Sequence, residues 1–282
     1  MKYLAEFEEA VLGFCVKPFF IDCLSGKKLY KIQKESGEII YEKEIFEKTG
    51  LARILMAGGG QIIISDFCSL YILNEDDYQL IGRWRIGSDL SSDICGLAVD
   101  ERKIFCSIRN GKLVTVDRKS FELTEYSVCD SSMWSLEIFN NYLLCGTVDG
   151  QLLFLNRETM KVIQKLSLSK QNVRSLFVDE KTVYAASQDR KISIIDLEKN
   201  EITRVQKSAH KKMFDCAGIY DNMLVTVSFP CSEIALWDRE TLEKKREIHV
   251  PLKLSGCTHI NGNILYISSR NICGIGLIDL DV

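Results

Sequence analysis

The stretch Val173–Ser208, VRSLFVDEKTVYAASQDRKISIIDLEKNEITRVQKS, contains four short runs that favour β-strands. These runs, SLFV, TVYAAS, KISIIDL and EITRVQ, are rich in β-branched and aromatic residues, and the turn-forming DEK, QDR and EKN separate them. Four antiparallel strands in about 36 residues make one small sheet, which cannot bury both of its faces alone. The stretch therefore predicts a sheet that packs between neighbours of the same kind.

The chain contains seven units of this kind. The third strand of each unit ends in an apolar residue followed by Asp, Asn or Gln, and these apolar residues recur every 39 to 43 positions. The short polar side chain that follows can accept hydrogen bonds from the backbone of the next turn. The period predicts seven four-stranded sheets. The seven apolar positions are Ile32, Leu73, Val116, Leu155, Ile195, Trp237 and Ile278.

The two ends of the chain complement each other. The last unit stops after its third strand, and Lys2–Glu8 (KYLAEFE) has strand character but belongs to no unit. Pairing this segment with residues 276–280 (GLIDL) would complete the last sheet and close a ring, which removes an open sheet edge. We therefore predict an all-β fold in a single domain over residues 1–282. It is a seven-bladed β-propeller with four-stranded antiparallel blades, the last blade being closed by the N-terminal strand.

Composition and charge narrow the classes of function. An apolar fraction of 46% with 27% charged residues is typical of a globular protein. The net charge is −3 and the lysines and arginines are scattered, so the concentrated positive field that nucleic acid requires is absent from the sequence. No apolar run approaches the length of a membrane span, and the N-terminus carries acids where a signal peptide carries bases. We expect a cytoplasmic protein that binds neither nucleic acid nor membrane.

The sequence offers no clear metal, cofactor or catalytic motif. Eleven cysteines fall mostly inside predicted strands without a CxxC or CxxxC pair, which indicates buried reduced thiols. His210, His249 and His259 lack metal-ligand spacing. The run Ala57–Gln61 (AGGGQ) lacks the Lys-Ser or Lys-Thr and the helix of a phosphate loop, so it predicts a hairpin turn. We expect no cofactor and no bound metal.

Several local segments resemble the WD40 and YVTN-like repeat family of β-propellers. Two of these segments are Ser187–Asp196 (SQDRKISIID) and Thr147–Asn156 (TVDGQLLFLN), and a third is the WD dipeptide at Trp237 and Asp238. The repeat period of about 40 residues is also similar to that of the family. Ala209-His210 stands where that family often has Gly-His. The resemblance implies that the loops entering the first strands, together with those between second and third strands, line one mouth of a central channel.

Carried over onto this chain, the family pattern gives a candidate binding surface. It aligns Arg53, Cys95, Trp134, Arg174, Phe214 and Ser255 at the starts of the innermost strands, and arginine and aromatic residues are enriched at interface hot spots. The alternative is that Trp134 and Phe214 pack between blades. With charged residues of nearby loops, the predicted partner-binding set is Arg53, Asp93, Trp134, Arg174, His210, Phe214 and Arg270.

These observations favour a non-catalytic scaffold that binds a protein or peptide at the channel mouth through preorganised complementarity. The alternative from another class is a propeller enzyme, a lyase or hydrolase, with its active site at the same mouth. That alternative requires a metal or a converging set of His and carboxylate groups, for example around His210. A third hypothesis is a sensor that binds a small ligand in the channel itself.

Overall fold

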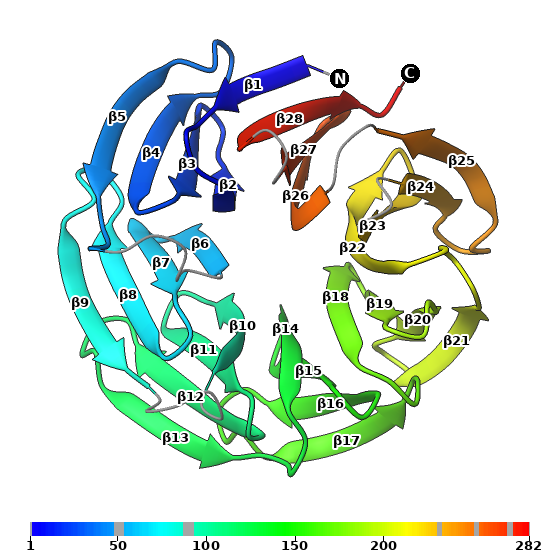
Figure 1. Ribbon diagram of the computed structural model, residues 1–282. Helices are drawn as coiled ribbons and strands as arrows, with labels where there is room; N and C mark the ends of the chain where they lie inside the picture. The colour runs from blue at the N-terminus through cyan, green and yellow to red at the C-terminus, as the bar shows by residue number, and fades with distance from the viewer. Residues whose placement is uncertain are drawn as a thin grey trace.

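The computed structural model describes residues 2–47, 54–86, 93–229, 233–250, 254–269 and 273–281. These residues form 28 β-strands and no helix. The strands make seven four-stranded antiparallel sheets, and the sheets stand as blades around a common axis (Figure 1). The predicted seven-bladed β-propeller is confirmed.

In blades 1 to 6 the four strands follow one another in sequence from the axis outward (Figure 1). Blade 1 has β2 (Val11–Val16), β3 (Phe20–Ser25), β4 (Lys28–Gln33) and β5 (Ile39–Glu44). Blade 2 has β6 (Ile54–Gly58), β7 (Gln61–Ser65), β8 (Ser69–Asn74) and β9 (Leu80–Arg85), and blade 3 has β10 (Ile94–Val99), β11 (Lys103–Ile108), β12 (Lys112–Asp117) and β13 (Leu123–Ser127).

The second half of the ring continues this order up to the last blade. Blade 4 has β14 (Met133–Phe139), β15 (Tyr142–Thr147), β16 (Gln151–Asn156) and β17 (Val162–Ser167), and blade 5 has β18 (Val173–Asp179), β19 (Thr182–Ser187), β20 (Ile192–Asp196) and β21 (Glu201–Gln206). Blade 6 has β22 (Met213–Tyr220), β23 (Met223–Phe229), β24 (Glu233–Asp238) and β25 (Lys244–His249), and blade 7 has β26 (Leu254–Asn261), β27 (Ile264–Ser269), β28 (Gly274–Asp279) and β1 (Lys2–Glu6).

The N-terminal strand closes the ring. β1 pairs antiparallel with β28, with Tyr3 opposite Gly276 and Glu6 opposite Gly274. The Phe7 backbone N–H continues the ladder by donating to the Cys273 carbonyl at 2.7 Å. In Figure 1 the two ends of the chain accordingly lie side by side at the last blade. The predicted closure is confirmed, and the pairing reaches two residues further toward the start of β28 than the sequence suggested.

The core lies between the blades. The described residues form seven apolar clusters, and each cluster joins two neighbouring sheets. Strand β15 shows how one strand serves two of them, because Leu143 and Cys145 face blade 3 while Leu144 faces blade 5. All three side chains are fully buried, and complete burial of one leucine contributes roughly 2 kcal/mol. Both faces of β15 are thus packed, which suits its nearly continuous apolar sequence.

The polar residue after the apolar position closes the turn between the third and fourth strands. The Asp238 carboxylate accepts backbone N–H bonds from Glu240 at 3.1 Å and Thr241 at 2.8 Å. These bonds, together with the Thr241 hydroxyl, hold the pKa of Asp238 below its usual value. Equivalent pairs of bonds are made by Asn74, Asp117, Asn156 and Asp196.

The glycine run of blade 2 is a hairpin turn, as predicted. Gly59 and Gly60 connect β6 to β7 and have φ angles of +56° and +75°. Two consecutive residues in the left-handed region match the twist of a tight hairpin, and glycine adopts this conformation without steric cost. The run therefore serves the fold.

Candidate functional site

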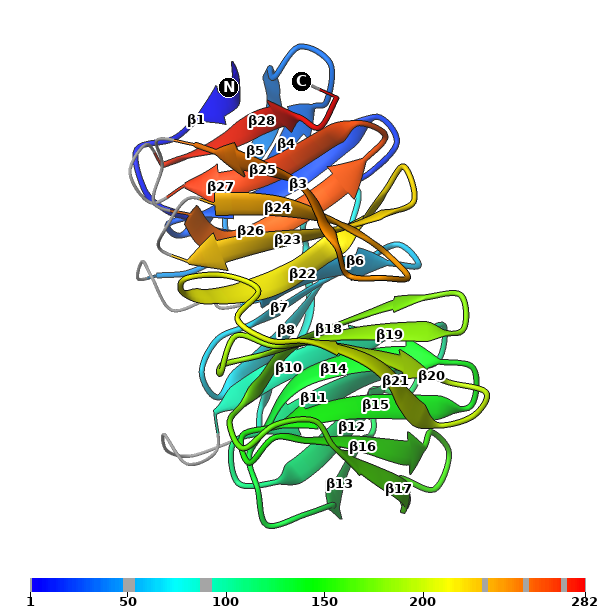
Figure 2. The same cartoon turned by 90° about the vertical axis from the view of Figure 1, so that its right-hand side faces the viewer.

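The loops lie on two opposite faces of the ring (Figure 2). One face carries the loops between blades and the hairpins between second and third strands, and we call it the loop face. The other carries the hairpins between first and second strands and between third and fourth strands, and we call it the turn face. The described segments of the loop face include residues 109–111, 128–132, 148–150, 168–172, 188–191 and 207–212.

Trp134 and Arg174 occupy equivalent places on the loop face. Each is the second residue of an innermost strand, β14 and β18, and these two strands are neighbours. The register shifts between Met133 and Ser135 around Trp134, and it shifts in the same way around Arg174. A bulge of this kind redirects the side chain of the extra residue away from the regular ladder. Both side chains are half-buried, so part of each remains accessible to a partner.

Phe214 does not share this position. It pairs with Ser228, which is the place that Val173 has opposite Ser187 in blade 5. Phe214 is fully buried and packs in the cluster between blades 5 and 6. A buried ring cannot contact a partner, so the predicted role of Phe214 at the binding surface is wrong and the alternative of packing between blades holds.

The misplacement of Phe214 has a physical cause. In β22 the register shifts between Cys216 and Gly218, several residues later than the shift at the start of β14 and β18. The start of β22 is therefore offset by one residue relative to the starts of β14 and β18, and Phe214 takes the place of Val173 instead of that of Arg174. Asp215, which the sequence reasoning missed, takes the place beside Arg174 and is half-buried.

Arg174 and Asp215 form an ion pair across the two innermost strands. The Arg174 Nε–H donates to Asp215 Oδ1 at 3.2 Å, and Nη2 donates to Oδ2 at 3.4 Å. Burial raises the pKa of Asp215, and the guanidinium opposes this shift. The two-point contact fixes the plane of the guanidinium, because its fork matches a carboxylate. Met213, with 36% of its surface exposed, lies beside it, with its sulfur 4.0 Å from Arg174 Nη1.

His210 is a structural residue of blade 6. Its Nε2 lies 2.7 Å from Thr226 Oγ1, which also accepts a 2.7 Å hydrogen bond from the Trp237 indole N–H. Its Nδ1 lies 2.7 Å from Glu233, and its ring centroid lies 4.7 Å from that of Phe214. Burial lowers the pKa of His210, and Glu233 opposes the shift. With 3% of its surface exposed, His210 cannot serve as the predicted contact residue.

The remaining predicted residues divide into one buried acid and two positions outside the described residues. Asp93 is 1% exposed and pairs with Arg109 at 2.8 Å, so its carboxylate is used within the blade. Arg53 and Arg270 fall outside the described residues. Of the predicted set, Trp134 and Arg174 are thus the described side chains that the structure brings together on the loop face.

A cavity of about 420 Å³ opens on the loop face between blades 3 and 4. The Thr147 hydroxyl donates to the Asp149 carboxylate at 2.5 Å on its wall. Burial raises the pKa of the Cys129 thiol. The lining residues are Cys129, Asp130, Ser131, Thr147, Asp149, Gln151, Leu153 and Lys165.

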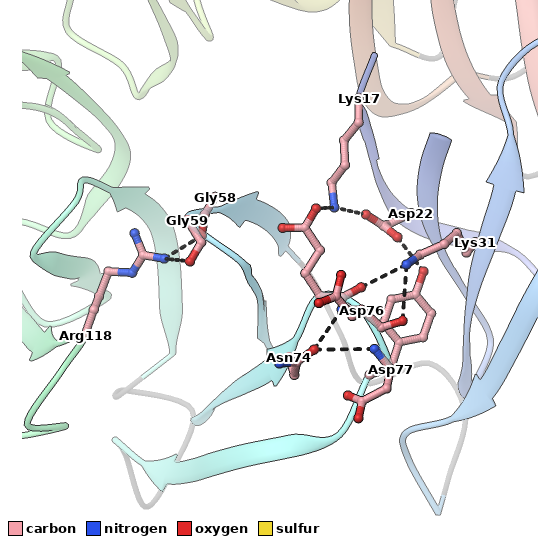
Figure 3. Close-up of polar contacts among 11 residues, drawn as sticks. Lys17, Asp22, Lys31, Gly58, Gly59, Asn74, Asp76, Asp77 and Arg118 are labelled. Carbon is pink, nitrogen blue, oxygen red and sulfur yellow. Dashed lines mark hydrogen bonds and ion pairs between the residues drawn. The ribbon is translucent and has the colours of Figure 1, made fainter. Parts of the chain in front are cut away.

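On the turn face, by contrast, charged side chains hold neighbouring blades together (Figure 3). Arg118 of blade 3 donates to the carbonyls of Gly58 and Gly59 in blade 2. Lys17 of blade 1 pairs with Glu75 of blade 2 at 2.5 Å, as well as with the buried Asp22 of its own blade. Lys31 of blade 1 donates to the carbonyl of Glu75 at 3.0 Å. These charged side chains therefore serve to hold the blades together.

The family of this chain can be assigned from its repeated four-stranded sheets and from a match of its sequence to a known repeat domain. Residues 98–278 match the WD40 repeated domain. The chain belongs to this WD40 family. The hydrogen-bonded His210, Thr226 and Trp237, with the Trp237-Asp238 dipeptide closing the third strand, lie within the matched segment.

Two further proteins are similar to this WD40 chain. The outer membrane protein assembly factor BamB of Shewanella oneidensis is 23% identical over 190 residues, which are 64% of this chain and 47% of that protein. The chain thus matches about half the length of this curated relative. A crystal structure of the computationally designed Ika8 protein superposes with a TM-score of 0.77 at 12% identity, over 99% of this chain and 100% of the designed one. At that identity the likeness shows the fold alone.

The described residues hold neither a metal-binding cluster nor a membrane-spanning helix. Among them, no cluster of three or more His, Cys, Asp or Glu side chains could hold a metal ion. The described part of the chain also holds no helix with the length and apolar character to span a bilayer.

Proposed function

We propose that this WD40 propeller is a non-catalytic platform that binds a protein or peptide on its loop face. The observation that carries the proposal is the pair Trp134 and Arg174, which stand at matching bulges of adjacent innermost strands and remain partly accessible. Tryptophan and arginine are among the residue types most enriched at the hot spots of protein interfaces. The ion pair with Asp215 preorganises the guanidinium, which reduces the entropy lost on binding.

The difference between the two faces supports this choice. On the turn face, Arg118, Lys17 and Lys31 each bond to a group of the neighbouring blade, so a partner would have to break contacts between blades to use these charges (Figure 3). The loop face has Trp134 together with an exposed Met213. Met adapts its shape to varied partners because its side chain is flexible and polarizable.

The enzyme alternative receives less support. It needs a base at the mouth, and His210, the histidine predicted there, is buried with both ring nitrogens next to polar partners. A general base must reach the proton that it removes from a substrate. The His210–Glu233 pair lies too deep for that contact.

We propose the cytoplasm as the compartment, with neither membrane nor nucleic acid as a partner. The ten described cysteines form no disulfide with one another, which suits a reducing environment. The relative BamB is by its name an outer membrane assembly factor, so an envelope location is the competing assignment. Fractionation of the native cell tests this: recovery of the protein with the membrane or envelope fraction would contradict the proposal.

A pull-down from extract of the native cell tests the binding face. Two bait proteins are compared, the wild type and a Trp134→Ala, Arg174→Ala double variant. We expect the variant to lose the partners that wild type recovers, while a Trp84→Ala, Arg157→Ala variant keeps them. This control also removes one tryptophan and one arginine. Trp84 lies on the outermost strand β9, and Arg157 lies on the turn face, where it pairs with Asp100 at 3.6 Å. Recovery of the same proteins by the Trp134, Arg174 variant would show that the face is wrong.

A further inference from the structure

Five exposed cationic side chains gather on the loop face over blades 5 and 6. They are Lys170 in the loop before β18, Arg190 in the hairpin between β19 and β20, and Lys207, Lys211 and Lys212 in the loop before β22. None of the five forms an ion pair with another described residue. We call these five residues the basic patch.

Backbone hydrogen bonds hold the three segments of the basic patch together. The Gln188 N–H donates to the Asn172 carbonyl at 2.8 Å, which joins the hairpin to the loop before β18. The Ala209 N–H donates to the Arg190 carbonyl at 2.9 Å, which joins the same hairpin to the loop before β22. The five cations therefore belong to one surface of fixed backbone, although 42 residues separate the first from the last.

The acids around the basic patch are already neutralised. Asp189 pairs with Lys191 at 2.5 Å, and Asp215 pairs with Arg174 at 3.2 Å. Glu233 is 3% exposed. The five free cations thus have no nearby carboxylate of the described residues left to cancel them, and the local potential is positive although the whole chain carries −3.

We propose that the basic patch binds an acidic segment of the partner protein, beside the contact made by Trp134 and Arg174. The inference rests on the proposed function and adds the chemistry of the partner. Opposite charges on the two surfaces would steer the encounter and set the orientation of the bound segment. The apolar side chains of Trp134 and Met213 then contact apolar residues that flank the acids.

The surroundings favour a protein over nucleic acid. The basic patch covers two blades, and on the next blade Asp130 and Asp149 are exposed on the same face. A phosphate backbone that extended across the face would meet these carboxylates, whereas a short acidic peptide segment would not. Nucleic acid binding also draws on many phosphate contacts at once, and five cations supply few.

The test measures fluorescence anisotropy of a labelled peptide of Glu-Leu-Ser repeats, about 12 residues long, at about 50 mM salt. The same peptide with Lys in place of Glu, and a single-stranded DNA of similar length, serve as further probes. We expect wild type to bind the Glu peptide more tightly than the other two. The variant Arg190→Glu, Lys211→Glu, Lys212→Glu should weaken this binding by about tenfold or more, since three attractive contacts become repulsive.

The matched control is Arg102→Glu, Lys119→Glu, Lys161→Glu, which makes the same change of charge on the turn face with exposed residues. We expect its affinity for the Glu peptide to stay within about twofold of wild type, because screening limits the reach of distant charges. Absence of binding to the Glu peptide, an equal loss in the control, or tighter binding of DNA than of the Glu peptide would each overturn the proposal.

Failure of this inference is distinguishable from failure of the proposed function. If the Trp134, Arg174 double variant loses the native partners in the pull-down while the charge-reversed variant of the basic patch keeps them, the platform stands and the acidic segment does not. If neither variant loses them, both proposals fall.

Discussion

Glu137 is a carboxylate in the wall of the ring that should make stability depend on pH. It lies on the innermost strand β14, where burial raises its pKa from 4.5 to about 7. A hydrogen bond from the Ile138 backbone partly opposes this shift by lowering the pKa. The neighbouring innermost strand β10 carries no charged side chain. On the other neighbour, β18, Arg174 and Asp179 are paired with residues of blade 6.

The sign follows from comparing the two states. Because the folded pKa of Glu137 lies above its unfolded value, the unfolded chain releases the proton first as pH rises, and this ionisation favours unfolding. This loss of folding stability is absent below pH 4.5, grows between pH 4.5 and about 7, and stays constant above that range. The full loss amounts to about 3 kcal/mol. Glu137→Gln removes the ionisation while keeping nearly the same shape.

The assay is denaturant unfolding of wild type and Glu137→Gln from about pH 4 to about pH 8.5. We expect the variant to gain stability over wild type as pH rises, by up to about 3 kcal/mol at neutral pH relative to acid pH. Glu158→Gln, a change at an exposed carboxylate on a turn, is the control and should show no such gain. A difference between Glu137→Gln and wild type that is the same at every pH would refute the reasoning.

Three further predictions concern the contacts that hold the blades. Trp237→Phe removes the indole donor to Thr226 inside blade 6 and should lower the free energy of unfolding by about 1–2 kcal/mol; an unchanged denaturation midpoint would contradict this. Arg118→Ala leaves the carbonyl of Gly58, among others, without its donor, and we expect a loss of about 2–3 kcal/mol in the same measurement. Deletion of the chain up to Glu8 removes the strand paired with β28, so the melting temperature should fall and light scattering should show association through the freed edge; a stable monomer would count against the closure.

The fold could be predicted because its signals are local and repeated. The spacing of the apolar positions and the polar residue after each, such as Asp196 and Asp238, reflect a turn that every blade needs. A ring of identical sheets also leaves few topologies to choose from. The leftover strand at the N-terminus matched the gap in the last blade, which fixed the closure.

The site was harder to predict because it depends on one-residue register and on burial. A later bulge in β22 moves Phe214 inward and puts Asp215 beside Arg174. No turn residue in the sequence indicates the position of this bulge. His210 lies in a loop by sequence, yet it is buried against Thr226 in a different strand. The Trp237-Asp238 dipeptide of the same blade was the available signal, since its indole shares that threonine.

Hydrogen–deuterium exchange of the protein, alone and bound to the partner recovered by the pull-down, tests the binding face most directly. We expect protection on binding in residues 128–134, 168–174 and 207–213, with little change in the turns between third and fourth strands. Protection centred on those turns, for example around residues 117–121 and 156–160, with none in the loops before β14, β18 and β22, would contradict the account.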